Sequence, residues 1–135
     1  MEASDSEETL PFERTPDEIA ALIDDGAQLI DVRQDYEFEA ARIPGASRIG
    51  LESVADHRDA IAKDRPVVFY CRTGTRSAMA AQAFSEAGYD VSSLKGGITA
   101  WVDAGKPVDP DDGYIAEPGQ AAAILEAKAL SLIHI

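Results

Sequence analysis

The stretch PVVFYCRTGTRSAMAAQAFSEAGY (residues 66–89) joins an apolar run to an alanine-rich segment through a short polar loop. Residues 66–71 are apolar throughout, which is typical of a strand covered on both faces in the centre of a parallel sheet. Residues 77–89 repeat apolar positions on one face of a helix that Gly88 ends. A buried strand that leads through a loop into a helix predicts an α/β fold.

Helices and strands alternate along the rest of the chain as well. Thr15 and Glu18 form a capping-box pattern around Pro16, which predicts a helix that ends at Gly26. We further expect strands at residues 28–33 and 47–49, a strand and turn at 90–97, an amphipathic helix at 54–64 and a short helix at 98–105. This alternation predicts a layered α/β structure with a mainly parallel central sheet.

The composition limits the possible partners and locations of the protein. With 135 residues the chain is long enough for one domain of ordinary size. Its 25 acidic and 12 basic residues give a formal net charge of −13, which repels a polyanion, so we expect no nucleic acid partner. No apolar run reaches the roughly 18 residues that cross a bilayer, and the acidic start MEASDSEET is the opposite of a signal peptide. We therefore expect a cytoplasmic protein without membrane association.

The loop at residues 71–77 is the candidate functional site. Cys71 ends the central strand, and ligands of open α/β sheets bind at this end of the strands. Gly74 permits a positive φ, so the loop can curl its backbone N–H groups around the sulfur. Arg72 and Arg76 add two positive charges. Since helix N-termini and cations stabilise thiolates, we expect Cys71 to be a nucleophile in an anion-binding loop. The alternative is a small buried hydrophobic residue.

Three stretches together resemble the single-domain rhodanese family of thiosulfate and persulfide sulfurtransferases. They are DVRQDYEFEAARIPGA (31–46), CRTGTRSA (71–78) and LKGGITAW (94–101), in the order that the family shows. The resemblance implies an α/β, rhodanese-like three-layer fold with a mainly parallel central sheet flanked by helices. It also implies that Cys71 accepts a sulfane sulfur, becomes a persulfide and passes the sulfur on. The substrate-binding residues that it implies are Arg72, Thr73, Gly74, Thr75, Arg76 and Ser77.

The resemblance implies a rhodanese-like domain at residues 11–106. We expect residues 1–10 to be a disordered acidic tail and residues 107–135 to be an acidic C-terminal extension. The last six residues, LSLIHI (130–135), can be written in codons that resemble a transposon-end adapter of sequencing libraries. They are therefore either a sequencing artefact or a native apolar C-terminus.

The length of the loop separates sulfur transfer from related activities. Four residues stand between Cys71 and Arg76. The dual-specificity phosphatases and arsenate reductases on the related scaffold resemble each other in having five. Because a phosphoryl or arsenyl group is bulkier than one sulfur atom, the shorter loop favours sulfur transfer over these two activities.

The single cysteine determines what partners the reaction needs. No second thiol can resolve a Cys71 persulfide internally, so we expect a small anionic sulfur donor and an external acceptor such as cyanide, glutathione, thioredoxin or a carrier protein. The alternative function is a sulfur-carrier or docking module that relays persulfide from a desulfurase to a biosynthetic partner protein. We expect no cofactor, and no metal site because His57 and His134 lack clustered ligands.

Two further motifs are assigned structural roles. Asp31 and Arg33 are expected to form an ion pair that pins the end of the strand to the following turn, with Glu37 as a candidate partner. Gly96 and Gly97 are expected to form the turn that brings the last helix beside the loop of Cys71.

Overall fold

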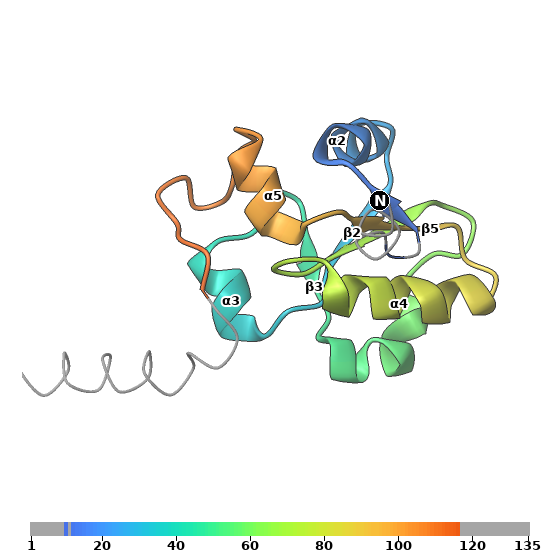
Figure 1. Cartoon of the computed structure of the whole chain (residues 1–135). Coiled ribbons are helices and arrows are strands. Elements are labelled where there is room, and N and C mark those ends of the chain that lie inside the picture. Colours follow the sequence, from blue (N-terminus) through green and yellow to red (C-terminus); the bar gives the residue numbers. More distant parts are fainter. Residues whose placement is uncertain (1–9, 11, 117–135) are drawn as a thin grey trace, which may run out of the picture.

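The computed structural model describes residue 10 and residues 12–116, and within them the chain forms a parallel sheet of five strands (Figure 1). The strand order is β1-β5-β4-β2-β3, and every pairing is parallel. The strands are β1 (Glu13–Arg14), β2 (Gln28–Asp31), β3 (Ser47–Arg48), β4 (Val67–Tyr70) and β5 (Val91–Leu94). The helical segments are α2 (Pro16–Asp24), α3 (Asp35–Ala40), the 3₁₀ turns η1 (Leu51–Ser53) and η2 (Ala55–Ala60), α4 (Thr75–Glu86) and α5 (Gly97–Asp103). The α/β fold with a parallel central sheet is confirmed.

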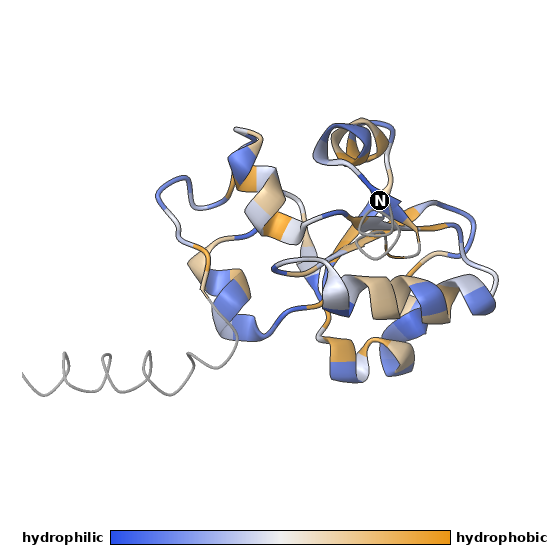
Figure 2. Ribbon diagram, in the orientation of Figure 1, coloured by the Kyte–Doolittle hydropathy of each residue, from blue (hydrophilic) through white to orange (hydrophobic). Residues whose placement is uncertain are grey.

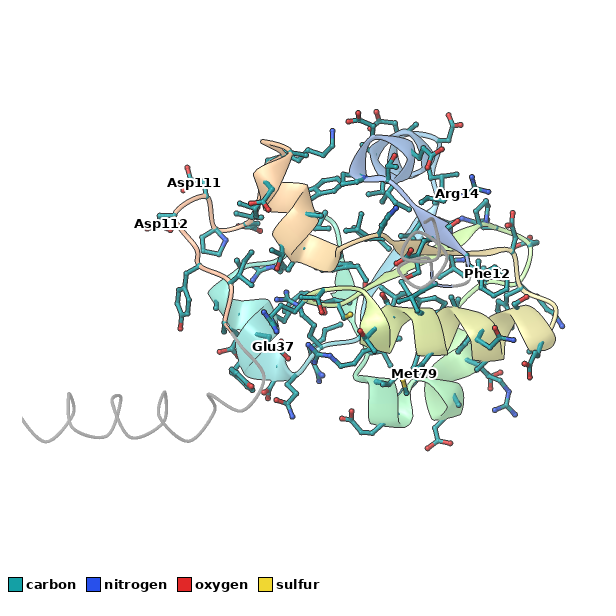
Figure 3. The ribbon with its side chains drawn as sticks, viewed as in Figure 1. Phe12, Arg14, Glu37, Met79, Asp111 and Asp112 are labelled. Carbon is teal, nitrogen blue, oxygen red and sulfur yellow. The ribbon has the colours of Figure 1, made fainter. Side chains whose placement is uncertain are left out.

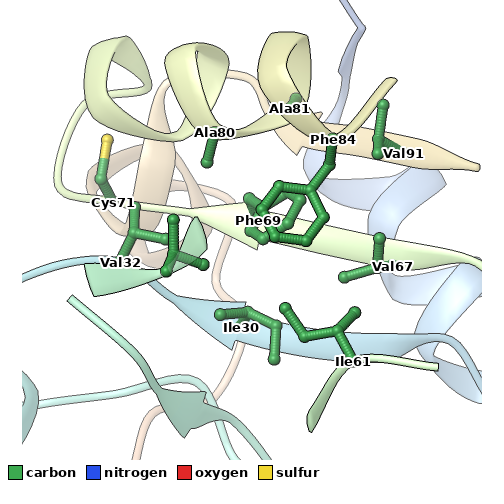
Figure 4. Packing of buried hydrophobic residues seen from close by; sticks show 11 residues of the cluster. Ile30, Val32, Ile61, Val67, Phe69, Cys71, Ala80, Ala81, Phe84 and Val91 are labelled. Carbon is green, nitrogen blue, oxygen red and sulfur yellow. The ribbon is translucent and has the colours of Figure 1, made fainter. Parts of the chain in front are cut away.

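Helices cover both faces of the sheet, so that β4 is buried on both sides. Val67 and Phe69 pack under α4 and the 3₁₀ turns, whereas Val68 and Tyr70 pack against α2 and α5. The rings of Phe69 and Phe84 lie 5.1 Å apart between their centroids (Figure 4). Apolar residues are concentrated in the layers around the sheet, and the outer faces of the helices are largely hydrophilic (Figure 2). This accounts for the continuous apolar run of the central strand.

Two local predictions differ from the structure. The amphipathic helix expected at 54–64 is wrong, because Ala55–Ala60 form the 3₁₀ turn η2 and His57 within it leaves helical geometry at φ −105°. Its apolar periodicity reflects only the two buried anchors Val54 and Ile61. Strand β1 was not anticipated, since a strand of two residues is too short to show alternation.

The turn before α5 holds that helix against the loop of Cys71, as the sequence predicts. Gly97 has φ +63°, and a Cβ atom there would overlap the carbonyl groups of Cys71 and Arg72. The close approach lets the Ile98 N–H donate to the Cys71 carbonyl (2.9 Å). The Thr99 N–H donates to the Arg72 carbonyl (3.2 Å). Glycine is therefore required where α5 meets the loop.

The described part of the C-terminal extension packs against the rest of the fold. Asp109 pairs with Arg42 through two backbone hydrogen bonds of 2.8 and 3.0 Å, and Ala116 is buried. The N-terminal residues 1–9 and the segment 117–135, including LSLIHI, lie outside the described residues, so the predictions for them stay open. Among the residues that are described, no helix is both long and apolar enough to cross a membrane.

A Gly97→Ala substitution should destabilise the protein more than Gly105→Ala. Both glycines have positive φ, at +63° and +79°, but a Cβ at Gly105 would meet no atom within 4 Å. Left-handed strain alone should lower the free energy of unfolding by about 1–2 kcal/mol at Gly105. Overpacking should add about 1–3 kcal/mol at Gly97. Urea unfolding followed by the fluorescence of Trp101 measures both, and equal losses would contradict the close approach.

Candidate active site

The sulfur of Cys71 lies at the carboxyl end of β4, beneath the first turn of α4 (Figure 4). Cys71 is buried, with 1% of its surface exposed. Its Sγ atom accepts hydrogen bonds from the backbone N–H groups of Gly74 (3.1 Å) and Ser77 (3.4 Å). Gly74 has φ +109°, and this left-handed turn curls the loop around the sulfur.

The sulfur takes the place of a helix-capping side chain. The N-cap residue of α4 is Gly74, which has no side chain to accept a hydrogen bond from the first turn. The Sγ atom of Cys71 accepts the N–H of Ser77, the third residue of the helix, as a capping oxygen would. The first turn of α4 contains no acidic residue, so no carboxylate of the helix itself competes with the sulfur for the positive end of the helix dipole.

The loop holds further donors that have no partner. Among the described residues, no group accepts a hydrogen bond from the backbone N–H of Arg72, Thr73, Thr75 or Arg76. These groups follow one another around the loop that also supplies the two donors to Sγ. Such consecutive N–H groups form an anion-binding nest, which suits a second sulfur atom or the oxygens of an anionic donor.

The side chains of the loop differ in exposure. Thr73 and Thr75 are exposed, Arg72 and Arg76 are half-buried, and Ser77 is buried. The structure therefore brings the whole predicted set together in one loop, but only the backbone groups of Gly74 and Ser77 and the hydroxyl of Ser77 contact the sulfur.

A buried pair of hydroxyl groups lies behind the sulfur. The Ser77 Oγ atom is 3.6 Å from the Cys71 Sγ and 2.8 Å from the Oγ of Ser93, and it donates to the Gly74 carbonyl (3.1 Å). Ser93 belongs to β5 and is fully buried. Ser93 is not predicted as a site residue. The sequence feature that could have indicated it is a polar residue within the buried strand VSSL.

The charge of Arg76 is compensated by Glu37. Glu37 lies on α3 (Figure 3). The Nη1 and Nη2 atoms of Arg76 lie 2.9 and 3.0 Å from Oε1 and Oε2 of Glu37, so the pair is bidentate. Burial of the Glu37 carboxyl group raises its pKa. The hydrogen bonds from Arg76 and from the Gln34 backbone outweigh burial and hold the pKa below its ordinary value of 4.5. The hydrogen bond to Glu37 likewise raises the pKa of Arg76.

This pair corrects the role expected for Glu37. Arg33 pairs with Asp31 (Nη2 to Oδ2, 2.7 Å), as expected, and also donates to the Ala41 carbonyl (2.6 Å). The carboxylate of Glu37 holds Arg76 of the loop instead of Arg33. Nothing local in the sequence reveals this choice, because Glu37 and Arg76 are 39 positions apart.

Arg72 is consequently the arginine of the loop whose charge no carboxylate of the described residues compensates. No carboxylate of the described residues pairs with its guanidinium group, and its buried Nε atom has no hydrogen-bond partner among them. The sequence predicts two positive charges beside Cys71. Of these two arginines, Arg72 is the one without a carboxylate partner among the described residues, because Glu37 pairs with Arg76.

The described residues contain no group of three or more histidine, cysteine, aspartate or glutamate side chains that could hold a metal ion. His57 is exposed, and its Nδ1 atom lies 2.9 Å from the Ser53 carbonyl oxygen. His134 lies outside the described residues.

The family model of the rhodanese-like domain matches residues 15–104, two-thirds of the chain. The chain therefore belongs to the rhodanese family, and the resemblance is confirmed.

Known relatives include sulfurtransferases. The chain is 36% identical over 104 residues to thiosulfate sulfurtransferase GlpE of Pseudomonas aeruginosa, which covers 76% of this chain and 94% of GlpE. It is 41% identical over 103 residues to the probable adenylyltransferase/sulfurtransferase MoeZ of Mycobacterium tuberculosis, which covers 72% of this chain but only 25% of MoeZ. The crystal structure of a rhodanese-like domain protein from Staphylococcus aureus superposes with a TM-score of 0.61 at 28% identity, over 66% of this chain and 89% of that one.

A Glu37→Gln substitution should remove stability that depends on pH. Because the folded-state pKa of Glu37 is lowered, its contribution is present above the ordinary value of 4.5 and is lost as the pH falls through the folded-state pKa. At pH 7 the variant should lose about 1–3 kcal/mol of the free energy of unfolding. The difference from the wild type should shrink below about pH 4.5.

Urea unfolding between pH 7 and pH 3.5 measures this difference. Glu39→Gln is the matched control, since Glu39 lies on the same helix, is exposed and loses the same charge. It should stay within about 0.5 kcal/mol of the wild type at every pH. A difference for Glu37→Gln that does not change with pH would contradict the ionised pair.

Proposed function

We propose that this protein is a sulfurtransferase that carries a sulfane sulfur as a persulfide of Cys71. The observation that supports this most directly is the sulfur of Cys71 at the N-terminus of α4. It accepts two backbone N–H groups, and four neighbouring N–H groups have no partner among the described residues. Family membership and the sulfurtransferases among the relatives point to the same class of reaction.

In the first half-reaction the Cys71 thiolate attacks the outer sulfur of thiosulfate or of a persulfide. The S–S bond of the donor breaks, and its electron pair leaves with sulfite or with the donor's thiolate. A new S–S bond forms on Cys71, and the negative charge now rests on the terminal sulfur. The N–H groups of Arg72, Thr73, Thr75 and Arg76, which have no partner among the described residues, can stabilise this charge.

In the second half-reaction an external nucleophile attacks the terminal sulfur. Its bond to the Cys71 sulfur breaks, and the electron pair returns Cys71 to the thiolate. Cyanide gives thiocyanate, while a thiol of glutathione, thioredoxin or a carrier protein gives a new persulfide. The chain has one cysteine, so the acceptor is supplied from outside. A free catalytic thiol and thiol acceptors fit the reducing cytoplasm, where we place the protein.

A second candidate role is a persulfide relay to a biosynthetic partner protein. It is favoured by the similarity to MoeZ, whose name joins an adenylyltransferase to a sulfurtransferase and of which this chain matches a quarter. A relay would turn over thiosulfate poorly and would co-purify with one specific acceptor. Rapid turnover with free cyanide or glutathione would favour the enzyme.

Incubation with thiosulfate or a persulfide donor should add the mass of one sulfur atom to the intact protein. Because Cys71 is the single cysteine, the intact mass alone assigns the site. Cyanide should remove the added mass, and Cys71→Ser should never acquire it. The absence of an adduct from every donor in the correctly folded protein would rule out the proposed reaction.

A further inference from the structure

We propose that Glu37 determines which donor charge the site prefers. By compensating Arg76 it makes the site favour a singly charged sulfane sulfur donor, such as a hydropersulfide anion, over the thiosulfate dianion. This inference rests on the proposed sulfur transfer through Cys71. Glu37 does not touch the sulfur, and it acts through Arg76, so its role is that of a specificity-determining residue.

Carboxylates lie close to the loop on more than one side. Glu13 is one of them, because its Oε2 atom would be 3.7 Å from a Cβ atom at Gly74. Asp31 compensates Arg33, and Glu37 compensates Arg76. Arg72 has no carboxylate partner among the described residues. With Cys71 as the thiolate, Arg72 balances the sulfur, and the carboxylate of Glu13 leaves a negative charge in excess beside the loop. Every negative charge on the donor is then added without a matching cation.

The pair cannot release Arg76 to the donor easily. Glu37 is fully buried, and its Oε1 atom also accepts the Gln34 backbone N–H at 3.0 Å. Turning Arg76 away would leave a buried carboxylate without its counterion, which is strongly unfavourable. The bidentate geometry therefore keeps the charge of Arg76 neutralised while the donor binds.

The donor's charge then decides how strongly the site repels it. Coulomb energy is proportional to the charge of the donor, so the dianion thiosulfate meets twice the repulsion of a monoanion at the same distance. The leaving groups differ in charge in the same way as the donors. Thiosulfate releases the sulfite dianion, whereas a hydropersulfide releases a monoanionic thiolate. Both donors present the same outer sulfur to the backbone N–H groups of the loop, and any contact of these groups with donor oxygens is unchanged by a substitution at Glu37.

The test compares two donors of similar size that differ by one charge. Thiosulfate is a dianion, and methanethiosulfonate is a monoanion in which a methyl group replaces one oxygen. Both lose the outer sulfur to Cys71, and the leaving groups are sulfite and methanesulfinate. The ratio of kcat/KM for the two donors is the measurement, because any effect of a substitution on the shared Cys71 thiolate cancels in it.

Glu37→Gln should free the positive charge of Arg76. The expected rise in kcat/KM is about threefold for methanethiosulfonate and about tenfold for thiosulfate, roughly the square, because the charge is doubled. The double variant Glu37→Gln with Arg76→Gln removes both charges and should restore the wild-type ratio. Glu39→Gln removes one exposed charge from the same helix and should leave the ratio unchanged.

The Arg72→Gln variant is a second test that does not depend on the folding of the Glu37 variant. It removes the uncompensated cation, so kcat/KM for thiosulfate should fall by roughly the square of the factor for methanethiosulfonate. Circular dichroism confirms the fold of each variant. Equal factors for the two donors in Glu37→Gln or Arg72→Gln, with persulfide still forming on Cys71, would overturn this inference but leave the proposed function standing. Failure of both donors to load the wild-type Cys71 would overturn both.

Discussion

The hydrogen bond from the first turn of α4 to the sulfur of Cys71 is the interaction on which the site depends. The N-cap residue of α4 is Gly74, which offers no capping side chain. The sulfur at the end of β4 therefore accepts the Ser77 N–H, which would otherwise stay unpaired. Strand end, loop and helix are therefore one unit. The central position of β4, with both faces covered, gives this unit a fixed base.

A second helix N-terminus controls the opposite side of the loop. The first N–H groups of α5 bind the carbonyl groups of Cys71 and Arg72, and Gly97 makes the approach possible. Helix α5 thus satisfies these carbonyl groups, while the N–H groups of Gly74 and Ser77 in the same loop donate to the sulfur. The loop can bind an anion because its carbonyl groups are bound by α5, whereas its N–H groups at the start of α4 are directed to the sulfur.

The sequence predicted those parts of the molecule that local patterns determine. The apolar run of β4, the glycine of the loop and the helix that follows are adjacent in the chain, and so the position of Cys71 could be inferred. Glu37 and Ser93 could not be assigned, because their partners Arg76 and Ser77 lie 39 and 16 positions away and tertiary packing selects them. The sequence predicts an α-helix where the 3₁₀ turn η2 lies, because the buried residues Val54 and Ile61 imitate helical periodicity.

The recognition of sulfur and the recognition of charge rest on different parts of this site. Backbone N–H groups hold the sulfur, and their positions follow from the glycines and from the starts of two helices. Side-chain charges depend on which carboxylate reaches each arginine, and Glu37 reaches Arg76 from a separate helix. A change in α3 can therefore alter the charge offered to the donor while the backbone ring around Cys71 stays intact. Donor preference in this fold is then adjustable without disturbing the groups that carry the sulfur.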